Sequence, residues 1–228
     1  MSVDGVVLVH GSNLSGACWD PVVEHLRVAS VAVDLPGRGS RPADILGVTL
    51  DDCVEAVVDS ADAAGFAHVR LVGHSLGGVV ITETQRRYPG RVTELIYVGA
   101  LVPAQGASAA TIVFGADLPT DEPRMPTEER AKLFFANDMT DEQWGDIWNQ
   151  FVPESARLWN ARLSGPSVGV PTTYVSMTDD IGVPPELAQQ MIANSGSGVE
   201  HRVLSAGHMV MATKPTELAE VINDVVNC

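Results

Sequence analysis

The sequence predicts an α/β fold in which a mostly parallel, doubly wound sheet carries helices on both faces. Short apolar runs rich in β-branched residues alternate with helix-like segments through the first hundred residues, and this alternation resumes near the carboxyl end. Such alternation is typical of parallel sheets, because each crossover between parallel strands is long enough to hold a helix. Residues 103–166 lack strong strand runs and predict a helical insertion.

Four short apolar runs predict the strands of the amino-terminal half. They are residues 6–9, 30–33, 69–72 and 95–98. Residues 21–26 show a helical pattern, and Pro21 suits a first helical turn because its missing N–H needs no partner there. Thr49 and the acids behind it predict the start of a second helix, with apolar residues at helical spacing beyond. The order predicts successive βαβ units.

Two more strands and a closing helix are expected after the insertion. The strands are residues 172–177 and 201–204, and the helix is residues 215–226. We therefore assign residues 1–102 and 167–228 to the α/β core, and residues 103–166 to a helical cap or lid. This cap should lie over the carboxyl ends of the strands, where ligands bind in open α/β sheets.

The expected cap is rich in aromatic residues. It carries three of the four tryptophans and four of the five phenylalanines of the chain. These side chains predict the wall of an apolar pocket over the sheet. The alternative is that they form the core of an ordinary additional helix pair.

The net charge of the chain argues against two classes of binding partner. The chain has 228 residues and a formal net charge of −15, which disfavours binding to nucleic acid or to an anionic membrane surface. No apolar run approaches the roughly 18 residues needed to span a bilayer, and no signal-peptide pattern opens the chain. A cytoplasmic location is expected.

The most informative motif is Gly-His-Ser-Leu-Gly at residues 73–77. An expected strand precedes it and a helical pattern follows, which is the context of a nucleophile elbow. In such a turn the Ser75 hydroxyl is lifted above the sheet, and the Leu76 amide, at a helix N-terminus, is placed to bind an oxyanion. The alternative reading is a Gly/Ser turn without chemistry.

A serine nucleophile needs a base and a group that orients that base. Of six histidines, His208 lies on the loop between the last expected strand and the last helix, where a base can reach the elbow. The acid should follow residues 172–177, and the pattern there leaves Asp179 and Asp180 as equal candidates. The chain order serine, acid, histidine is the one expected on an α/β-hydrolase sheet.

The second oxyanion donor should come from the loop after the first strand. Ser12 follows His10 and Gly11 and is placed to offer its backbone N–H, while Gly11 would let the backbone approach a substrate oxygen. A simple glycine turn is the alternative.

Several segments together resemble the plant methylesterase and hydroxynitrile lyase group of α/β-hydrolases, as a bacterial member of its esterase branch. They are Val-Leu-Val-His-Gly-Ser at 7–12, Val-Asp-Leu-Pro-Gly-Arg-Gly at 33–39, the elbow at 72–78, Thr-Asp-Asp-Ile-Gly-Val-Pro at 178–184 and Gly-His-Met-Val-Met at 207–211.

The resemblance implies specific roles for individual residues. It implies Ser75 as nucleophile, His208 as base and Asp180, rather than Asp179, as the acid. It also implies the Ser12 and Leu76 amides as the oxyanion hole. The lyase branch typically has Thr after the first-loop His and Lys after the catalytic His, whereas this chain has Gly11 and Met209, which match the esterase branch.

The sequence thus predicts a serine hydrolase that cleaves a carboxylic ester or lactone of a small apolar substrate through an acyl-enzyme. No cofactor or metal is expected, and a homodimer is compatible with the sequence. Two other functions remain as alternatives. One is lyase or other biosynthetic chemistry on the same triad, and the other is non-catalytic ligand binding on this scaffold.

Overall fold

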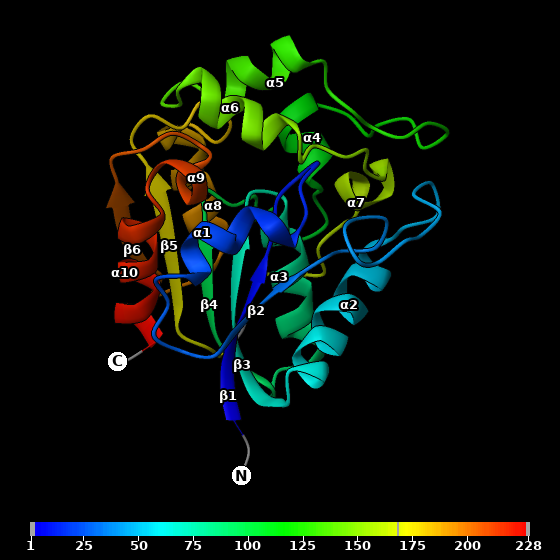
Figure 1. Cartoon of the computed structure of the whole chain (residues 1–228). Helices are drawn as coiled ribbons and strands as arrows, with labels where there is room; N and C mark the ends of the chain where they lie inside the picture. Colours follow the sequence, from blue (N-terminus) through cyan, green and yellow to red (C-terminus); the bar gives the residue numbers. More distant parts are fainter. Residues whose placement is uncertain (1–2, 168, 227–228) are drawn as a thin grey trace.

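The computed structural model describes residues 3–167 and 169–226, which fold around one six-stranded sheet (Figure 1). The strands are β1 (Val3–Val9), β2 (Ser30–Val33), β3 (Phe66–His74), β4 (Val92–Val98), β5 (Thr172–Met177) and β6 (Glu200–Leu204). Their order is β2-β1-β3-β4-β5-β6, and all pairings are parallel. The predicted doubly wound parallel sheet of an α/β fold is confirmed.

Both faces of the sheet are buried. In β1, Val7 and Val9 belong to the apolar core on one face, whereas Val6 and Leu8 belong to the core on the other. This division follows from the period of two in a strand, and it explains why the sequence reads as a continuous apolar run. Each face therefore needs its own layer of helices.

The two helical layers come from the segments between the strands. Helices α2 (Leu50–Ala63), α3 (Gly77–Arg87) and α8 (Pro185–Asn194) contribute to one core. Helices α1 (Asp20–Val23), α9 (Val210–Thr213) and α10 (Pro215–Val226), with the short 3₁₀ helix η1 (Gly16–Trp19), contribute to the other. Helix α2 begins with the expected cap, since the Thr49 side chain accepts the N–H of Asp52 and the Asp52 carboxylate accepts the N–H of Thr49.

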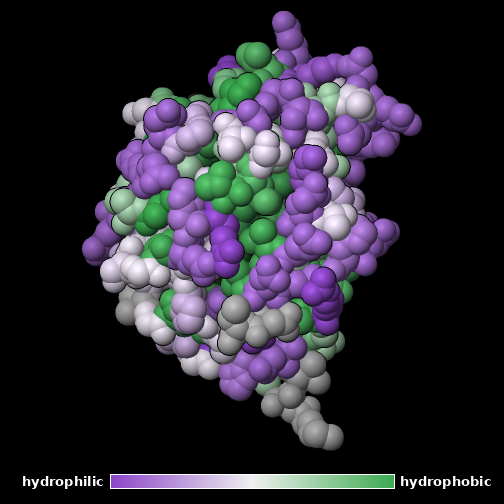
Figure 2. Space-filling view, turned by 90° about the vertical axis from the view of Figure 1, so that its left-hand side faces the viewer, coloured by the Kyte–Doolittle hydropathy of each residue, from purple (hydrophilic) through white to green (hydrophobic). Residues whose placement is uncertain are grey.

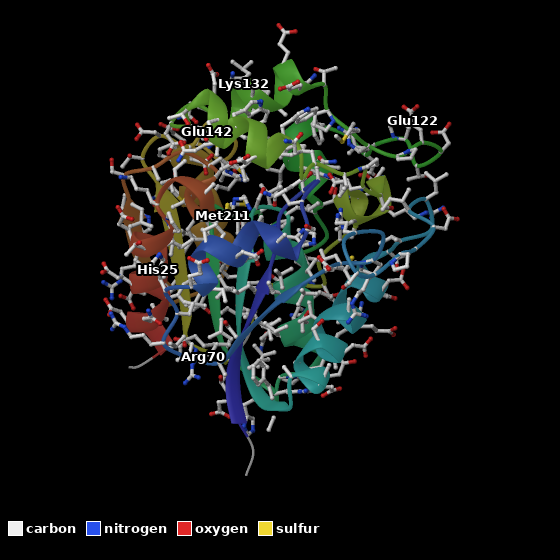
Figure 3. All side chains as sticks on the ribbon, viewed as in Figure 1. His25, Arg70, Glu122, Lys132, Glu142 and Met211 are labelled. Carbon is white, nitrogen blue, oxygen red and sulfur yellow. The ribbon has the colours of Figure 1, made fainter. Side chains whose placement is uncertain are left out.

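Four short helices lie in the segment predicted as a cap. They are α4 (Ala109–Phe114), α5 (Glu128–Phe135), α6 (Asp141–Trp148) and α7 (Ala156–Asn160). Figure 1 shows α5 and α6 above the carboxyl ends of the strands. Lys132 and Glu142 lie on the outer side of these two helices, whereas Met211 lies in the interior below them (Figure 3).

Sequence and structure differ mainly in short elements. The helix expected over residues 21–26 is only the four-residue α1, preceded by η1. Helix α8 follows the expected acidic turn and was not anticipated from its pattern. By contrast, β2, β5 and α10 have the predicted bounds.

Strand β6 forms one edge of the sheet, on the side shown in Figure 2, where hydrophobic surface is surrounded by hydrophilic residues. Val203 on this strand is 56% exposed, and Glu200 and Arg202 form an exposed ion pair beside it. Charges on an edge strand discourage pairing with another sheet. In residues 3–167 and 169–226, no helix is long and apolar enough to cross a membrane.

Candidate active site

Ser75 lies on a tight turn between β3 and α3. Its φ angle is +51°, in the left-handed region that non-glycine residues rarely adopt. Such a conformation costs on the order of 1–3 kcal/mol and is retained where the surroundings hold it in place. Here the Ser75 N–H donates to the carbonyl of Val98 at 3.1 Å, and its carbonyl accepts the N–H of Leu101 at 2.9 Å. The turn is therefore clamped to the end of β4.

Two glycines allow this turn to lie against the loop after β1. A Cβ at Gly77 would lie 2.7 Å from the carbonyl oxygen of Val9, so no side chain fits there. A Cβ at Gly11 would lie 2.8 Å from His74 Nδ1 and 2.9 Å from the Cβ of Ser75. Gly11 thus sets how closely the first loop approaches the serine.

His208 and Asp180 form a buried pair on the loops after β6 and β5. The Nδ1 atom of His208 lies 2.9 Å from both carboxylate oxygens of Asp180. Because an ionised carboxylate only accepts, Nδ1 carries the proton, and Nε2 is left with its lone pair. Asp180 also accepts the N–H of Val183 at 2.7 Å, which fixes the orientation of the carboxylate. This arrangement holds the imidazole in the tautomer that a general base requires.

The structure distinguishes the two neighbouring acids. Asp180 is buried against His208, whereas Asp179 is exposed and its carboxylate accepts a hydrogen bond from the Thr178 hydroxyl at 2.9 Å. The residue pattern does not show which of the two acids is buried and which is exposed. Of the two acids, Asp180 is the one that contacts His208.

Ser12 and Leu76 lie where two backbone donors are expected. Leu76 directly precedes α3, so its N–H is one of the amides that a helix N-terminus leaves unpaired. In the part of the chain that the structure describes, neither the Leu76 N–H nor the Ser12 N–H donates to a protein acceptor. Both amides are therefore available to a ligand oxygen.

A cavity of about 210 Å³ lies between the sheet and the helices above it. Ser75 and His208 both line it, together with Ser12. Its apolar walls come from α4, α5 and α7 and from the loops after β4 and β5: Val113, Phe114, Ala131, Phe134, Phe135, Trp159, Leu101 and Val183. The cavity is thus mainly apolar and of a size for a small molecule.

The aromatic residues of the insertion serve two purposes. Phe114, Phe134, Phe135 and Trp159 line the cavity, and the Phe135 ring stacks on the imidazole of His208 with centroids 5.1 Å apart. Trp144, by contrast, is buried within the core below α6. The insertion thus contributes some aromatic rings to the cavity wall and another to the core.

The residue pattern alone did not reveal Glu154 as part of this site. Its carboxylate is 1% exposed and pairs with Arg38 at 2.9 Å. It also accepts hydrogen bonds from the Ser12 hydroxyl and, at 2.5 Å, from the Trp159 indole. The backbone N–H of Asn13 donates to it at 3.3 Å. Glu154 thus ties the loop after β1 to the helical segment, a contact across 142 residues of sequence that no local signal predicts.

Two further histidines are buried, and one of them, His74, packs against His208 with ring centroids 4.7 Å apart. Burial lowers the pKa of His10 to about 3, and it lowers the pKa of His74 well below its usual value. His74 is therefore neutral, and its Nε2–H donates to the backbone carbonyl of His208 at 3.0 Å. His74 thus supports the loop that carries His208.

The described residues contain no cluster of three or more histidine, cysteine or acidic side chains suited to a metal ion.

Cys18 and Cys53 are buried free thiols. Burial raises the pKa of both, that of Cys53 to about 12. The third cysteine, Cys228, lies outside the described residues.

A serine on a strand-to-helix elbow, a buried histidine–carboxylate pair and a parallel sheet define the class of α/β hydrolases. Comparison with protein families agrees: the model of the alpha/beta hydrolase family matches residues 6–221. The chain belongs to this family.

Its relatives include ester hydrolases. A pyrethroid hydrolase from Sphingobium wenxiniae is 28% identical, and the match covers 98% of this chain and 88% of the relative. Esterase PIR7B from Oryza sativa subsp. japonica is 26% identical, with 97% and 95% covered. These relatives support the prediction of a carboxylic ester hydrolase.

Solved structures show the same architecture. The crystal structure of a pyrethroid hydrolase from Sphingobium faniae superposes with a TM-score of 0.82 at 25% identity, covering 100% of this chain and 98% of the other. A methylesterase from Arabidopsis gives a TM-score of 0.84 at 22% identity, covering 99% of both chains. The second likeness concerns the fold alone. The expected similarity to the methylesterase-like group is confirmed.

Proposed function

We propose that the chain is a serine esterase that hydrolyses a carboxylic ester, or a lactone, of a small and largely apolar substrate. The observation that carries the proposal is the pairing of His208 with Asp180 at 2.9 Å, beside the strained Ser75 in one apolar cavity. Burial keeps water from competing with the Asp180 contact, so the imidazole retains one orientation. Names of the relatives, which include esterase and hydrolase, support the same reaction class.

In the proposed mechanism, the Ser75 hydroxyl transfers its proton to His208 Nε2 and attacks the ester carbonyl. The tetrahedral oxyanion is bound by the free N–H groups of Ser12 and Leu76. His208 then protonates the leaving alkoxide, which departs as the alcohol and leaves an acyl-Ser75. Water attacks this acyl-enzyme with His208 as base, releasing the acid and regenerating the hydroxyl.

Residues 103–166 act in this proposal as a cap over a core formed by residues 1–102 and 167–228. The cap contributes Phe134 and Phe135 from α5 and Trp159 from α7 to the cavity wall. These rings exclude water and would contact the apolar part of the substrate. The partner would therefore be a small molecule, held under the cap.

The test combines turnover with covalent labelling. We expect burst and steady-state release of p-nitrophenol from a short-chain p-nitrophenyl ester, and one adduct by intact mass after treatment with a fluorophosphonate. Ser75→Ala should abolish both, and His208→Ala should lower both by several orders of magnitude. The adduct should map to Ser75 by peptide sequencing.

The outcomes separate the competing functions. Full activity in the Ser75→Ala protein would exclude this mechanism. A natural substrate cleaved without release of a carboxylic acid would indicate a lyase, so products must be identified as well as counted. Absence of both turnover and labelling would favour a ligand-binding protein on this scaffold.

A further inference from the structure

Two arginines in the cavity wall have no acidic partner. Arg124 and Arg130 both line the cavity, and within the described residues neither forms an ion pair. Apart from these arginines and His208, the residues that line the cavity include one other ionisable side chain, Glu154. Its carboxylate forms an ion pair with Arg38. A chain with a net charge of −15 thus places unmatched positive charge at this cavity.

The main chain of Arg124 is fixed beside the loop that carries Ser12. Its N–H donates to the carbonyl of Glu154 at 2.8 Å, and its own carbonyl accepts the N–H of Glu154 at 3.0 Å. The side-chain amide of Asn13 donates to the same carbonyl at 3.0 Å. The guanidinium lies over the Phe114 ring, 4.9 Å from its centroid. A half-buried arginine held in this way loses little freedom when it binds an anion.

Arg130 lies on α5 at the rim of the cavity, where it is exposed to solvent. Helical spacing places it on the same side as Ala131, Phe134 and Phe135, and all four line the cavity. Phe135 stacks on His208, so this face of the helix runs from the base toward Arg130. Arg130 and Phe135 are five positions apart, which corresponds to roughly 7.5 Å along the helix axis. An anion at Arg130 would thus be separated from the His208 end of the cavity by about the length of a short aliphatic chain.

We propose that Arg124 and Arg130 form a subsite for a carboxylate of the substrate, remote from the ester that is cleaved. This inference rests on the ester-hydrolase function proposed above and defines its substrate class. A guanidinium binds a carboxylate through paired N–H donors, and such charge-assisted bonds are about twice as strong as neutral ones. The phenylalanine rings would contact the apolar spacer between the two groups. The substrate is then a small ester of amphipathic character, such as the monoester of a dicarboxylic acid.

The kinetic test uses two esters of equal length. Mono-p-nitrophenyl adipate carries a terminal carboxylate, and p-nitrophenyl hexanoate carries a methyl group in its place. We expect the ratio of kcat/KM for adipate over hexanoate to fall at least about tenfold in the Arg124→Gln/Arg130→Gln protein. The Arg124→Lys/Arg130→Lys protein keeps both charges and should retain most of the ratio. The control is Arg202→Gln, which removes one positive charge from an exposed position on β6. It should leave the ratio at its wild-type value.

A binding test separates the subsite from the reaction. Titration calorimetry on the Ser75→Ala protein compares monomethyl adipate with methyl hexanoate, with and without the two arginine substitutions. We expect the ratio of the two affinities to fall at least about tenfold when the arginines are replaced.

The combined outcomes are distinct. If the affinity ratio falls but no protein hydrolyses either ester, the subsite stands and the proposed esterase function fails. If both esters are hydrolysed and the substitutions leave both ratios unchanged, the subsite is overturned while the esterase function stands. Equal losses for the two esters would likewise overturn it, because they would show a structural rather than a charge-specific role.

Discussion

Arg38 Nη2 lies 2.9 Å from Glu154 Oε2, and both side chains are 1% exposed. Arg38 follows β2 in the core, whereas Glu154 precedes α7 in the helical segment. The same carboxylate accepts the Ser12 hydroxyl and the Asn13 N–H. One buried ion pair therefore joins the segment above the cavity to the loop that is proposed to bind the oxyanion.

Breaking this ion pair should destabilise the folded protein. We expect Glu154→Gln to lower the free energy of unfolding by about 3–5 kcal/mol, because it leaves the Arg38 charge buried without a partner. Denaturant titration followed by fluorescence measures the change. Asp117→Asn, which breaks the exposed pair with Arg162, should cost less than about 1 kcal/mol. If both substitutions lowered the free energy of unfolding equally, the buried pair of Glu154 with Arg38 would be no more stabilising than an exposed one.

The two neighbouring acids should differ sharply in kinetics. Asp180→Asn should lower kcat by about 10⁴-fold, because the amide no longer fixes the His208 tautomer. Asp179→Asn removes the same charge one residue away, at an exposed position, and should change kcat by less than about twofold. Steady-state kinetics of both proteins on one ester provides the comparison, and a reversed order would assign the acid to Asp179.

Adding one methyl group at Gly11 should impair the reaction. The Cβ of Gly11→Ala would lie 2.9 Å from the Cβ of Ser75, so the first loop must move away from the serine. A displacement of this kind should lower kcat by about 10²-fold through the misplaced Ser12 amide. Gly145→Ala on α6 is the matched control, since its Cβ meets no atom within 4 Å. Active-site titration distinguishes lower kcat from loss of folded protein.

Stability should fall on mild acidification. The folded-state pKa of His10 is about 3, below its value of about 6.5 in the unfolded chain. Between these values the unfolded state binds one more proton, so the stabilisation present above pH 6.5 is lost as the pH falls toward 3. Each such histidine contributes a slope of about 1.4 kcal/mol per pH unit. His74 acts in the same direction.

This slope is measured as the free energy of unfolding between pH 6 and pH 4.5, a range that lies between the two pKa values of His10. We expect His10→Gln to reduce the slope by about 1.4 kcal/mol per unit, because glutamine does not titrate. The slope is the informative quantity, since the substitution also changes stability at every pH by removing the hydrogen bonds to Gly11 and Leu35. An unchanged slope would mean that His10 is protonated equally in both states.

Features encoded by neighbouring residues could be predicted well. The alternation of apolar runs and helical patterns predicted the parallel sheet, and the capping pattern at Thr49 predicted the start of α2. The motif at residues 73–77 predicted the elbow, because a strand, a strained turn and a helix within a few residues leave little conformational choice.

Other features depend on which distant residues meet. The residue pattern left Asp179 and Asp180 as equal candidates, and only the packing of the turn against His208 buries one and exposes the other. The aromatic pattern of the insertion indicated apolar walls but did not separate the cavity side chains from the core residue Trp144.

The sequence by itself thus determined the fold class, the strands and the positions of Ser75 and His208, because each is encoded by a local pattern of burial and backbone geometry. Only the tertiary structure decided that Glu154 closes an ion pair with Arg38, and that Arg124 and Arg130 line the cavity without acidic partners. Charge compensation depends on distances between residues that are far apart in the chain, and no local pattern encodes those distances.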